Sequence, residues 1–165
     1  MHALYVALDE KRSALDMSWA AVARAINSSF RDVPQHKPIA LSTITGLRTK
    51  ALGEGDGILQ MLIWLDATPE SFVRGVHDDS RKGKLRKLEP SQILRWNTQA
   101  IYVALDEKRT IEHLTWNEVA ARIGGLNAAS LTRMAKGGRT TFPHVMRIVR
   151  WLGTSAATFT RASDW

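Results

Sequence analysis

Apolar side chains recur every three or four residues along almost the whole chain, which is the spacing of one face of a helix. One such stripe contains Val119, Ala120 and Ile123, and another begins at Val145. No alternation of apolar and polar positions continues long enough to indicate a strand. The pattern therefore predicts an all-helical protein.

Capping residues and glycines mark where helices begin and end in the second half of the chain. Thr115 and Asn127 are suited to cap helix starts, and Gly124 and Gly125 follow an apolar stripe at a point where a helix would stop. Pro143 is suited to the first turn of a further helix. Five helices are expected there, at about 98–109, 115–123, 128–136, 143–152 and 155–159.

One stretch of sequence occurs twice in this chain. LYVALDEKR at residues 4–12 returns as IYVALDEKR at residues 101–109, an offset of 97. Farther along, Trp64 matches Trp151, so the offset has fallen to 87. Such a repeat indicates tandem domains. We expect a first copy at residues 1–75 and a second copy at residues 97–165, joined by an exposed linker at residues 76–96.

The change of offset shows that the first copy contains ten additional residues. All of them lie between Ile26 and Ile44, where the second copy has only a tight turn. Pro34 and Pro38 fall in this stretch and prevent a continuous helix. The first copy is therefore expected to have a longer loop between its second and third helices, and to be the more divergent domain.

Charge is distributed unevenly over the chain, whose formal net charge is +7. Residues 1–80 contain eight Lys and Arg against ten Asp and Glu, whereas residues 81–165 contain fifteen against six. Mutual repulsion among clustered cations favours contact with an anionic polymer, although a solvated linker is the alternative interpretation. Five cations fall within seven linker positions: Arg81, Lys82, Lys84, Arg86 and Lys87.

Composition excludes several classes of site. The chain has no cysteine, so disulfides, thiolate metal sites and cysteine nucleophiles are absent. No signal segment opens the sequence and no apolar run is long enough to span a bilayer, which favours a cytoplasmic, nucleoid-associated protein without membrane contact. We therefore expect a small globular protein of two domains.

Residue types with catalytic or metal-binding chemistry do not cluster. The five histidines lack the i, i+4 spacing and the acidic company of a metal site. The pair Asp9 and Glu10, repeated as Asp106 and Glu107, lies beside basic residues and is interpreted as an ion-paired helix face. The GEGDG segment lacks the Lys-Ser/Thr of a phosphate loop. No enzymatic activity, metal or cofactor is expected.

The order of elements in the second copy resembles the helix-turn-helix of the lambda-repressor-like (XRE-type) DNA-binding family. The matching residues are LTWNEVAARIGGLNAASLTRMAKGG at 114–138, followed by the apolar segment PHVMRIVRWLG. The first copy matches through MSWAAVARAIN and LSTITGLRTK, apart from its longer turn. The resemblance implies an all-α fold of two tandem five-helix domains joined by a basic linker. It also implies that the third helix of a copy enters the major groove of DNA.

Transferring the family's DNA-contacting positions to the second copy gives a set of candidate residues. Arg133 is the strongest candidate for direct contact with a base, because a guanidinium can bond both acceptors of guanine. The alternative is that Arg133 only solvates its helix. Lys136, Arg139 and the hydroxyls of Thr140 and Thr141 are suited to phosphate contacts. The base-facing positions implied by the resemblance are Ala128, Ala129, Ser130 and Arg133.

The corresponding positions in the first copy offer weaker chemistry. None has a side chain that could bond a base in a bidentate manner, and the surrounding charge is negative. We expect this surface to contact DNA, helped by Arg31, His36 and Lys37 in the loop. The alternative is a packing or dimerisation surface. The residues concerned are Leu41, Ser42, Thr43, Thr45 and Gly46, with Arg48, Thr49 and Lys50 beside them.

One tryptophan begins the second helix of each copy, where the family often has a residue that contacts phosphate. The indole N–H of Trp19 or Trp116 could donate to a phosphate oxygen, and the alternative is a core role. Trp64 and Trp151 are expected to be structural. These observations predict a sequence-specific transcriptional regulator, such as a repressor, that binds double-stranded DNA at an asymmetric or bipartite site.

The alternative prediction is an antitoxin-like or anti-activator module that binds another protein, with the first copy as its partner-binding surface. Because the two recognition helices differ, the bipartite site is expected to be asymmetric or to resemble a direct repeat. A homodimer is a further alternative.

Overall fold

The computed structural model describes residues 1–28, 38–50, 53–73, 83–89 and 91–164. Within these residues lie eight α-helices, four single-turn 3-10 helices and two strands. The first copy contains α1 (His2–Ala14), α2 (Trp19–Ile26), α3 (Leu41–Thr45), η2 (Gly46–Arg48), α4 (Gly55–Leu65) and η3 (Pro69–Phe72). The second contains α5 (Thr98–Ile111), α6 (Trp116–Ile123), α7 (Ala128–Arg133), η5 (Met134–Lys136), α8 (Phe142–Leu152) and η6 (Ala156–Phe159). The fifth helix of each copy is thus a single 3-10 turn.

Side-chain caps begin the helices of the second copy where the sequence predicts them. Thr115 and Glu118 form a reciprocal capping box at the start of α6. The Asn127 side chain accepts a hydrogen bond from the Ser130 backbone N–H, 2.8 Å away, at the start of α7. Gly124 ends α6 with a φ of 72°, a conformation that favours glycine. The expected helix ends around the turn are confirmed.

A small antiparallel sheet corrects the prediction of an all-helical fold. Strand β1 (Gln92–Trp96) pairs with β2 (Thr160–Asp164), with Leu94 opposite Ala162. Ile93, Leu94 and Trp96 are buried, although residues 76–96 were expected to form an exposed linker. Both strands have only five residues, too few to produce a recognisable alternation, and each forms its hydrogen bonds with a partner far away in sequence.

The repeated lysine holds the end of the fourth helix in each copy. Lys11 Nζ donates to the Trp64 carbonyl and lies 4.8 Å from that ring's centroid. Lys108 Nζ donates to the Trp151 carbonyl at 2.6 Å and lies 4.5 Å from its ring. A cation at a helix C-terminus satisfies a terminal carbonyl and interacts favourably with the helix dipole. This shared contact explains why the lysine occurs in both copies.

The repeated Asp-Glu-Lys-Arg segment also contains an ion pair on the helix surface. Arg12 pairs with Asp9 at 2.7 Å, and Arg109 pairs with Asp106 at the same distance. Each arginine also donates to a backbone carbonyl in the turn before the second helix, that of Met17 in the first copy and of Leu114 in the second. The ion-paired face is confirmed for Asp9 and Asp106, whereas Glu10 and Glu107 lie exposed on the same helices.

The long loop of the first copy is closed at its ends by one side chain. The Asn27 amide donates to the Ile39 carbonyl at 3.0 Å and its oxygen accepts from the Ile39 N–H at 2.8 Å. The connection from α2 to α3 spans residues 27–40, against 124–127 between α6 and α7. The prediction of a longer connection is confirmed. The paired ends let α3 pack against α2 as α7 packs against α6.

The two copies are joined by a backbone bridge between equivalent residues. Glu54 pairs with Thr141 in an isolated antiparallel bridge, and these positions correspond at the offset of 87. The Gly55 N–H donates to the Thr140 carbonyl at 3.1 Å, and the Phe142 N–H donates to the Gly53 carbonyl at 3.2 Å. Replacing each residue of the first hydrogen bond by its equivalent in the other copy gives the second hydrogen bond. The copies are therefore related by a local two-fold axis through the bridge.

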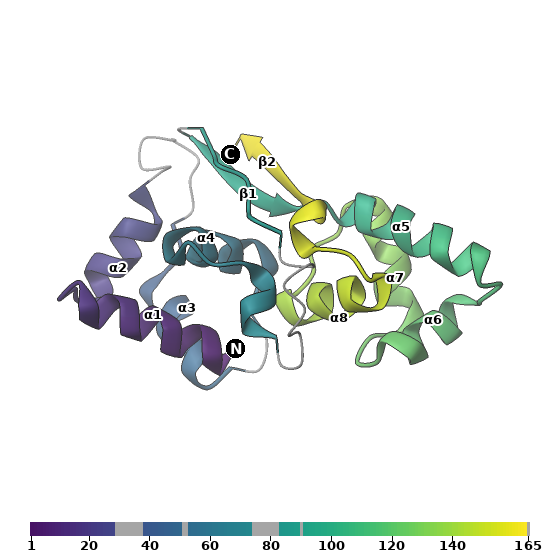
Figure 1. Cartoon of the computed structure of the whole chain (residues 1–165), viewed down its shortest axis with the longest axis horizontal. Coiled ribbons are helices and arrows are strands. Elements are labelled where there is room, and N and C mark those ends of the chain that lie inside the picture. Colours follow the sequence, from purple (N-terminus) through teal and green to yellow (C-terminus); the bar gives the residue numbers. More distant parts are fainter. Residues whose placement is uncertain (29–37, 51–52, 74–82, 90, 165) are drawn as a thin grey trace.

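Contacts between equivalent helices follow the same two-fold axis. α4 packs against α8, and η3 packs against η6, so each element meets its own equivalent in the other copy. Figure 1 shows α4 and α8 at the centre of the molecule, with α1 and α2 at one end and α5 and α6 at the other. The apolar core continues across both copies. Such a self-complementary interface is that of a two-fold symmetric dimer, here formed within one chain.

Strand β1 strengthens the connection because it leads into α5 but lies along α4. The Gln60 side-chain amide donates to the Leu94 carbonyl at 2.9 Å. The Asp56 carboxylate accepts from the Trp96 N–H at 3.0 Å. Glu70 is 4% exposed and its carboxylate accepts from the Ala156 N–H at 2.7 Å. One oxygen of the buried Glu70 carboxylate is thus satisfied by the second copy, while Gln60 and Asp56 bond to the strand that leads into it.

Candidate nucleic-acid interface

Helix α7 presents a polar face to solvent and an apolar face to the core. Leu131 and Met134 are buried beneath it. Arg133 and Ala129 are exposed, whereas Ala128 and Ser130 are half-buried near the start of the helix. Arg133 is therefore exposed on a short helix that packs on α6 and continues into η5, which packs on α5. This is the placement that direct base contact requires.

The turn before α7 is fixed by an arginine from α8. Arg147 donates to the Gly124 carbonyl at 3.0 Å. Its guanidinium also covers Gly125, where an added Cβ would stand 1.3 Å from an Arg147 nitrogen. Both glycines have a φ of 72°. Gly125 is thus required for its backbone conformation and for the close approach of Arg147, and α7 is positioned by a rigid turn.

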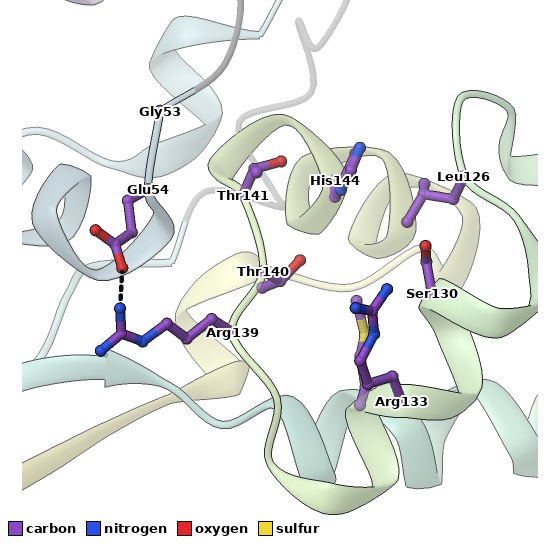
Figure 2. A pocket seen from close by; sticks show the side chains of 10 residues that line it. Gly53, Glu54, Leu126, Ser130, Arg133, Arg139, Thr140, Thr141 and His144 are labelled. Carbon is purple, nitrogen blue, oxygen red and sulfur yellow. Dashed lines mark hydrogen bonds and ion pairs between the residues drawn. The ribbon is translucent and has the colours of Figure 1, made fainter.

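A cleft of about 380 Å³ separates α7 from the start of α8, and we call it the second-copy cleft. Figure 2 shows the guanidinium of Arg133 and the hydroxyls of Ser130 and Thr140 turned toward the same space. The hydroxyl oxygens of Thr140 and Thr141 are buried and have no hydrogen-bond partner. The cleft is lined by Gly53, Glu54, Leu126, Ser130, Arg133, Met134, Arg139, Thr140, Thr141 and His144.

The chemistry of the second-copy cleft suits an anionic oxygen. Burial, reinforced by the nearby positive charge of Arg147, lowers the pKa of His144 below its usual value, so the imidazole is neutral at pH 7. Two cations, Arg133 and Arg139, also line the cleft. Unpaired hydroxyls next to a guanidinium can donate to a phosphate oxygen. Because both hydroxyl oxygens are buried in this structure, the expected phosphate contacts of Thr140 and Thr141 stay a prediction.

The bridge carries an ion pair at the edge of the cleft. Arg139 pairs with Glu54 of the first copy at 3.0 Å, and the two side chains are 86% and 63% exposed. Figure 2 shows this pair beside the hydroxyl-lined space. Lys136 is exposed at the end of η5. Sequence reasoning did not include Glu54, although its equivalence with Thr141 at the offset of 87 was an available signal.

Helix α3 presents a different surface at the corresponding place in the first copy. Leu41 is 42% exposed, and Ser42 and Thr43 are also exposed. Thr45 turns its hydroxyl back to the Leu41 carbonyl at 3.1 Å, so it is engaged within its own helix. The side chain of Lys50 lies over Gly46, with its Cε 3.3 Å from where a Cβ would stand. Arg48, Thr49 and Lys50 are exposed.

The cleft beside α3 is the counterpart of the second-copy cleft, and we call it the first-copy cleft. It has a volume of about 500 Å³ and shares Gly53, Glu54 and Arg139 with the other. Ile39, Thr43, Leu47 and Gly57, which line it, correspond to Leu126, Ser130, Met134 and His144. The equivalents of Arg133 and Thr141 are Gly46 and Glu54. The two-fold pair of clefts is therefore electrostatically unequal.

The tryptophans at the start of α2 and α6 form part of a stack on the surface. Trp116 lies 5.2 Å from the Tyr102 ring and 5.1 Å from the Arg109 guanidinium. Trp19 stacks in the same way, 5.3 Å from Tyr5. Both indoles are half-buried. They pack against the core as one interpretation expected, and they keep exposed ring surface, so the proposed phosphate contact stays a prediction.

The linker cations lie against the first copy. Leu85 and Leu88 pack on the core, while Arg86 and Lys87 between them and Lys84 before them are exposed. This segment borders a cleft of about 680 Å³ with the ends of α2 and α4. The linker here is anchored rather than a free arm. Arg81 and Lys82, like Arg31, His36 and Lys37 of the long loop, lie outside the described residues.

No group of three or more His, Asp or Glu side chains in the described ranges could hold a metal ion. None of the described helices is long and apolar enough to cross a membrane. Comparison of the chain with protein-family models, curated proteins and solved structures gives no match. A function for this chain is therefore inferred from its residues and their geometry.

Proposed function

We propose that this chain is a sequence-specific double-stranded DNA-binding transcriptional regulator. The observation that supports the proposal is the outward placement of Arg133 on α7, a short helix supported by a rigid turn. The major groove of B-DNA admits one helix, so a reader must present a short polar helix beyond its scaffold. The resemblance to XRE-type helix-turn-helix proteins points to the same element.

Charge supports this assignment. Residues 97–165, which contain α7, have nine Lys and Arg against five Asp and Glu, a formal net charge of +4 that attracts phosphates. In the proposal Arg133 contacts a base edge and Lys136 contacts the backbone, while Arg139 becomes available to the backbone when its ion pair with Glu54 opens. Phosphate contacts set the position of the helix, and base contacts give sequence preference.

Binding-site selection from a random duplex library tests the proposal. Arg133→Ala is expected to relax the preference at one base pair and to weaken binding about 5- to 150-fold, the equivalent of 1–3 kcal/mol for a bidentate contact. Arg161→Ala removes the same charge from β2, where the side chain is also exposed, and serves as the matched control. Equal effects of the two substitutions would show that Arg133 acts only through its charge.

A second candidate function is supported by the surface of α3. Exposed Leu41 begins a short uncharged helix in the copy with the negative balance, which suits contact with a protein better than with phosphate. This function is an antitoxin-like or anti-activator interaction module. Retention on mixed-sequence DNA at low salt, with and without glutamine at the five basic positions of 81–87, separates the two. Indifference to DNA in both proteins favours the interaction module.

A further inference from the structure

We infer that a single chain binds two unlike half-sites in inverted orientation, with α7 on one and α3 on the other. The inference rests on the proposed DNA-binding function and adds the orientation of the target and the stoichiometry. Tandem copies in a sequence could equally face the same way and favour a direct repeat. The arrangement of the copies in space decides whether the half-sites are inverted or directly repeated.

The bridge determines this arrangement. The reciprocal bonds from Gly55 to Thr140 and from Phe142 to Gly53 exchange the copies by a half-turn. A half-turn leaves every point at its original height along the axis. The equivalent helices α3 and α7 therefore lie at the same height, and their directions perpendicular to the axis are opposite. Figure 1 shows them on opposite sides of the centre.

The clefts place both helices beside the bridge. The first-copy cleft is bounded by Thr43 and Leu47, and the second-copy cleft by Ser130 and Met134. Both clefts share Glu54 and Arg139 of the bridge. The surface thus runs from α3 across the bridge to α7. Duplex DNA has two-fold axes of its own perpendicular to its length, so a reader with this symmetry fits half-sites on opposite strands.

The inequality of the clefts predicts inequality of the half-sites. The half-site under α7 faces Arg133, whereas the half-site under α3 faces Ser42 and Thr43, with Gly46 at the position equivalent to Arg133. Hydroxyls give weaker discrimination than a bidentate guanidinium. Selection should therefore recover one well-defined half and, about one helical turn or 10–10.5 bp away, one less defined half.

Duplexes made from the selected site test the orientation. One keeps both half-sites as recovered, one reverses the α3 half-site at the same spacing, and one scrambles it. We expect reversal to weaken binding of the full chain about tenfold or more, as far as scrambling does, because the second contact is effectively intramolecular. Native mass spectrometry should find one chain on each duplex.

Two substitutions test which helix binds which half-site. Arg133→Ala should reduce preference in the well-defined half only, and Thr43→Val in the other half only. Circular dichroism and thermal unfolding verify that both variants fold. Equal binding to recovered and reversed duplexes, a preference for the direct order, or two chains on each duplex would overturn the inference while leaving DNA binding intact. Absence of any enriched duplex would instead refute the proposed function.

Discussion

Glu54→Gln is expected to strengthen DNA binding, an outcome that a survey of charged residues would not suggest. In the structure the Glu54 carboxylate lies 3.0 Å from the Arg139 guanidinium at the bridge, between the two candidate recognition helices. Both side chains are mostly exposed, so the ion pair contributes little to folding. The substitution should leave stability nearly unchanged and release one cation for phosphate.

The size of the gain follows from counterion release. The logarithm of the binding constant falls with a slope of about −0.9 per phosphate contact against the logarithm of salt concentration. One additional phosphate contact should therefore steepen the slope by about 0.9. If the variant and the original chain bind equally at 1 M salt, the variant should bind about eightfold more tightly at 0.1 M salt. Fluorescence anisotropy on the selected duplex over a range of salt concentrations measures both quantities.

Two controls make this prediction specific. Glu107→Gln removes an exposed carboxylate from α5, away from the bridge, and should change the slope less. In an Arg139→Ala background Glu54→Gln should give no comparable gain, because the released cation is absent. An unchanged slope in the single variant, or a full gain in the double variant, would refute the idea that Glu54 occupies Arg139.

Three further substitutions test the scaffold. Lys108→Met keeps the aliphatic stem but removes the hydrogen bond at the end of α8, and should lower the unfolding free energy by about 1–2 kcal/mol in urea titrations. Glu70→Ala leaves the Ala156 N–H buried without its acceptor and should cost about 1–3 kcal/mol, with Glu70→Gln costing less in the same assay. Hydrogen bonds from the backbone and side chain of Thr115 lower the pKa of Glu118, so its stabilising effect is present above the ordinary pKa of 4.5 and is lost as the pH falls through the lower folded value. Melting temperatures measured between about pH 6 and pH 3 should therefore fall less steeply for Glu118→Gln than for the original chain.

Local chemistry explains what could be predicted from the sequence. Thr115 and Asn127 cap helices through contacts within three residues, so their roles follow from spacing alone. The repeat gave independent support, because equivalent helices occur in both copies. The exposure of Arg133 also followed from its place on the polar side of a short helix.

Contacts between distant segments could not be predicted in this way. The sheet depends on β1 meeting a strand that begins 64 residues after the end of β1, at Thr160. The bridge between Glu54 and Thr141 depends on how the copies dock, which no local pattern specifies. The anchoring of Leu85 and Leu88 on the first copy is a tertiary contact for the same reason. Charge clustering alone therefore suggested a freer linker than the structure has.

The bridge between the copies has a consequence for behaviour on dilution. Two-fold readers assembled from separate chains dissociate when their concentration falls below the dimer constant, so their occupancy of DNA rises steeply with protein level. Here the equivalent surfaces belong to one polypeptide and meet through the backbone at Glu54 and Thr141. Their pairing is independent of the number of molecules in solution. Occupancy should then follow a simple hyperbola down to the scarcest protein levels.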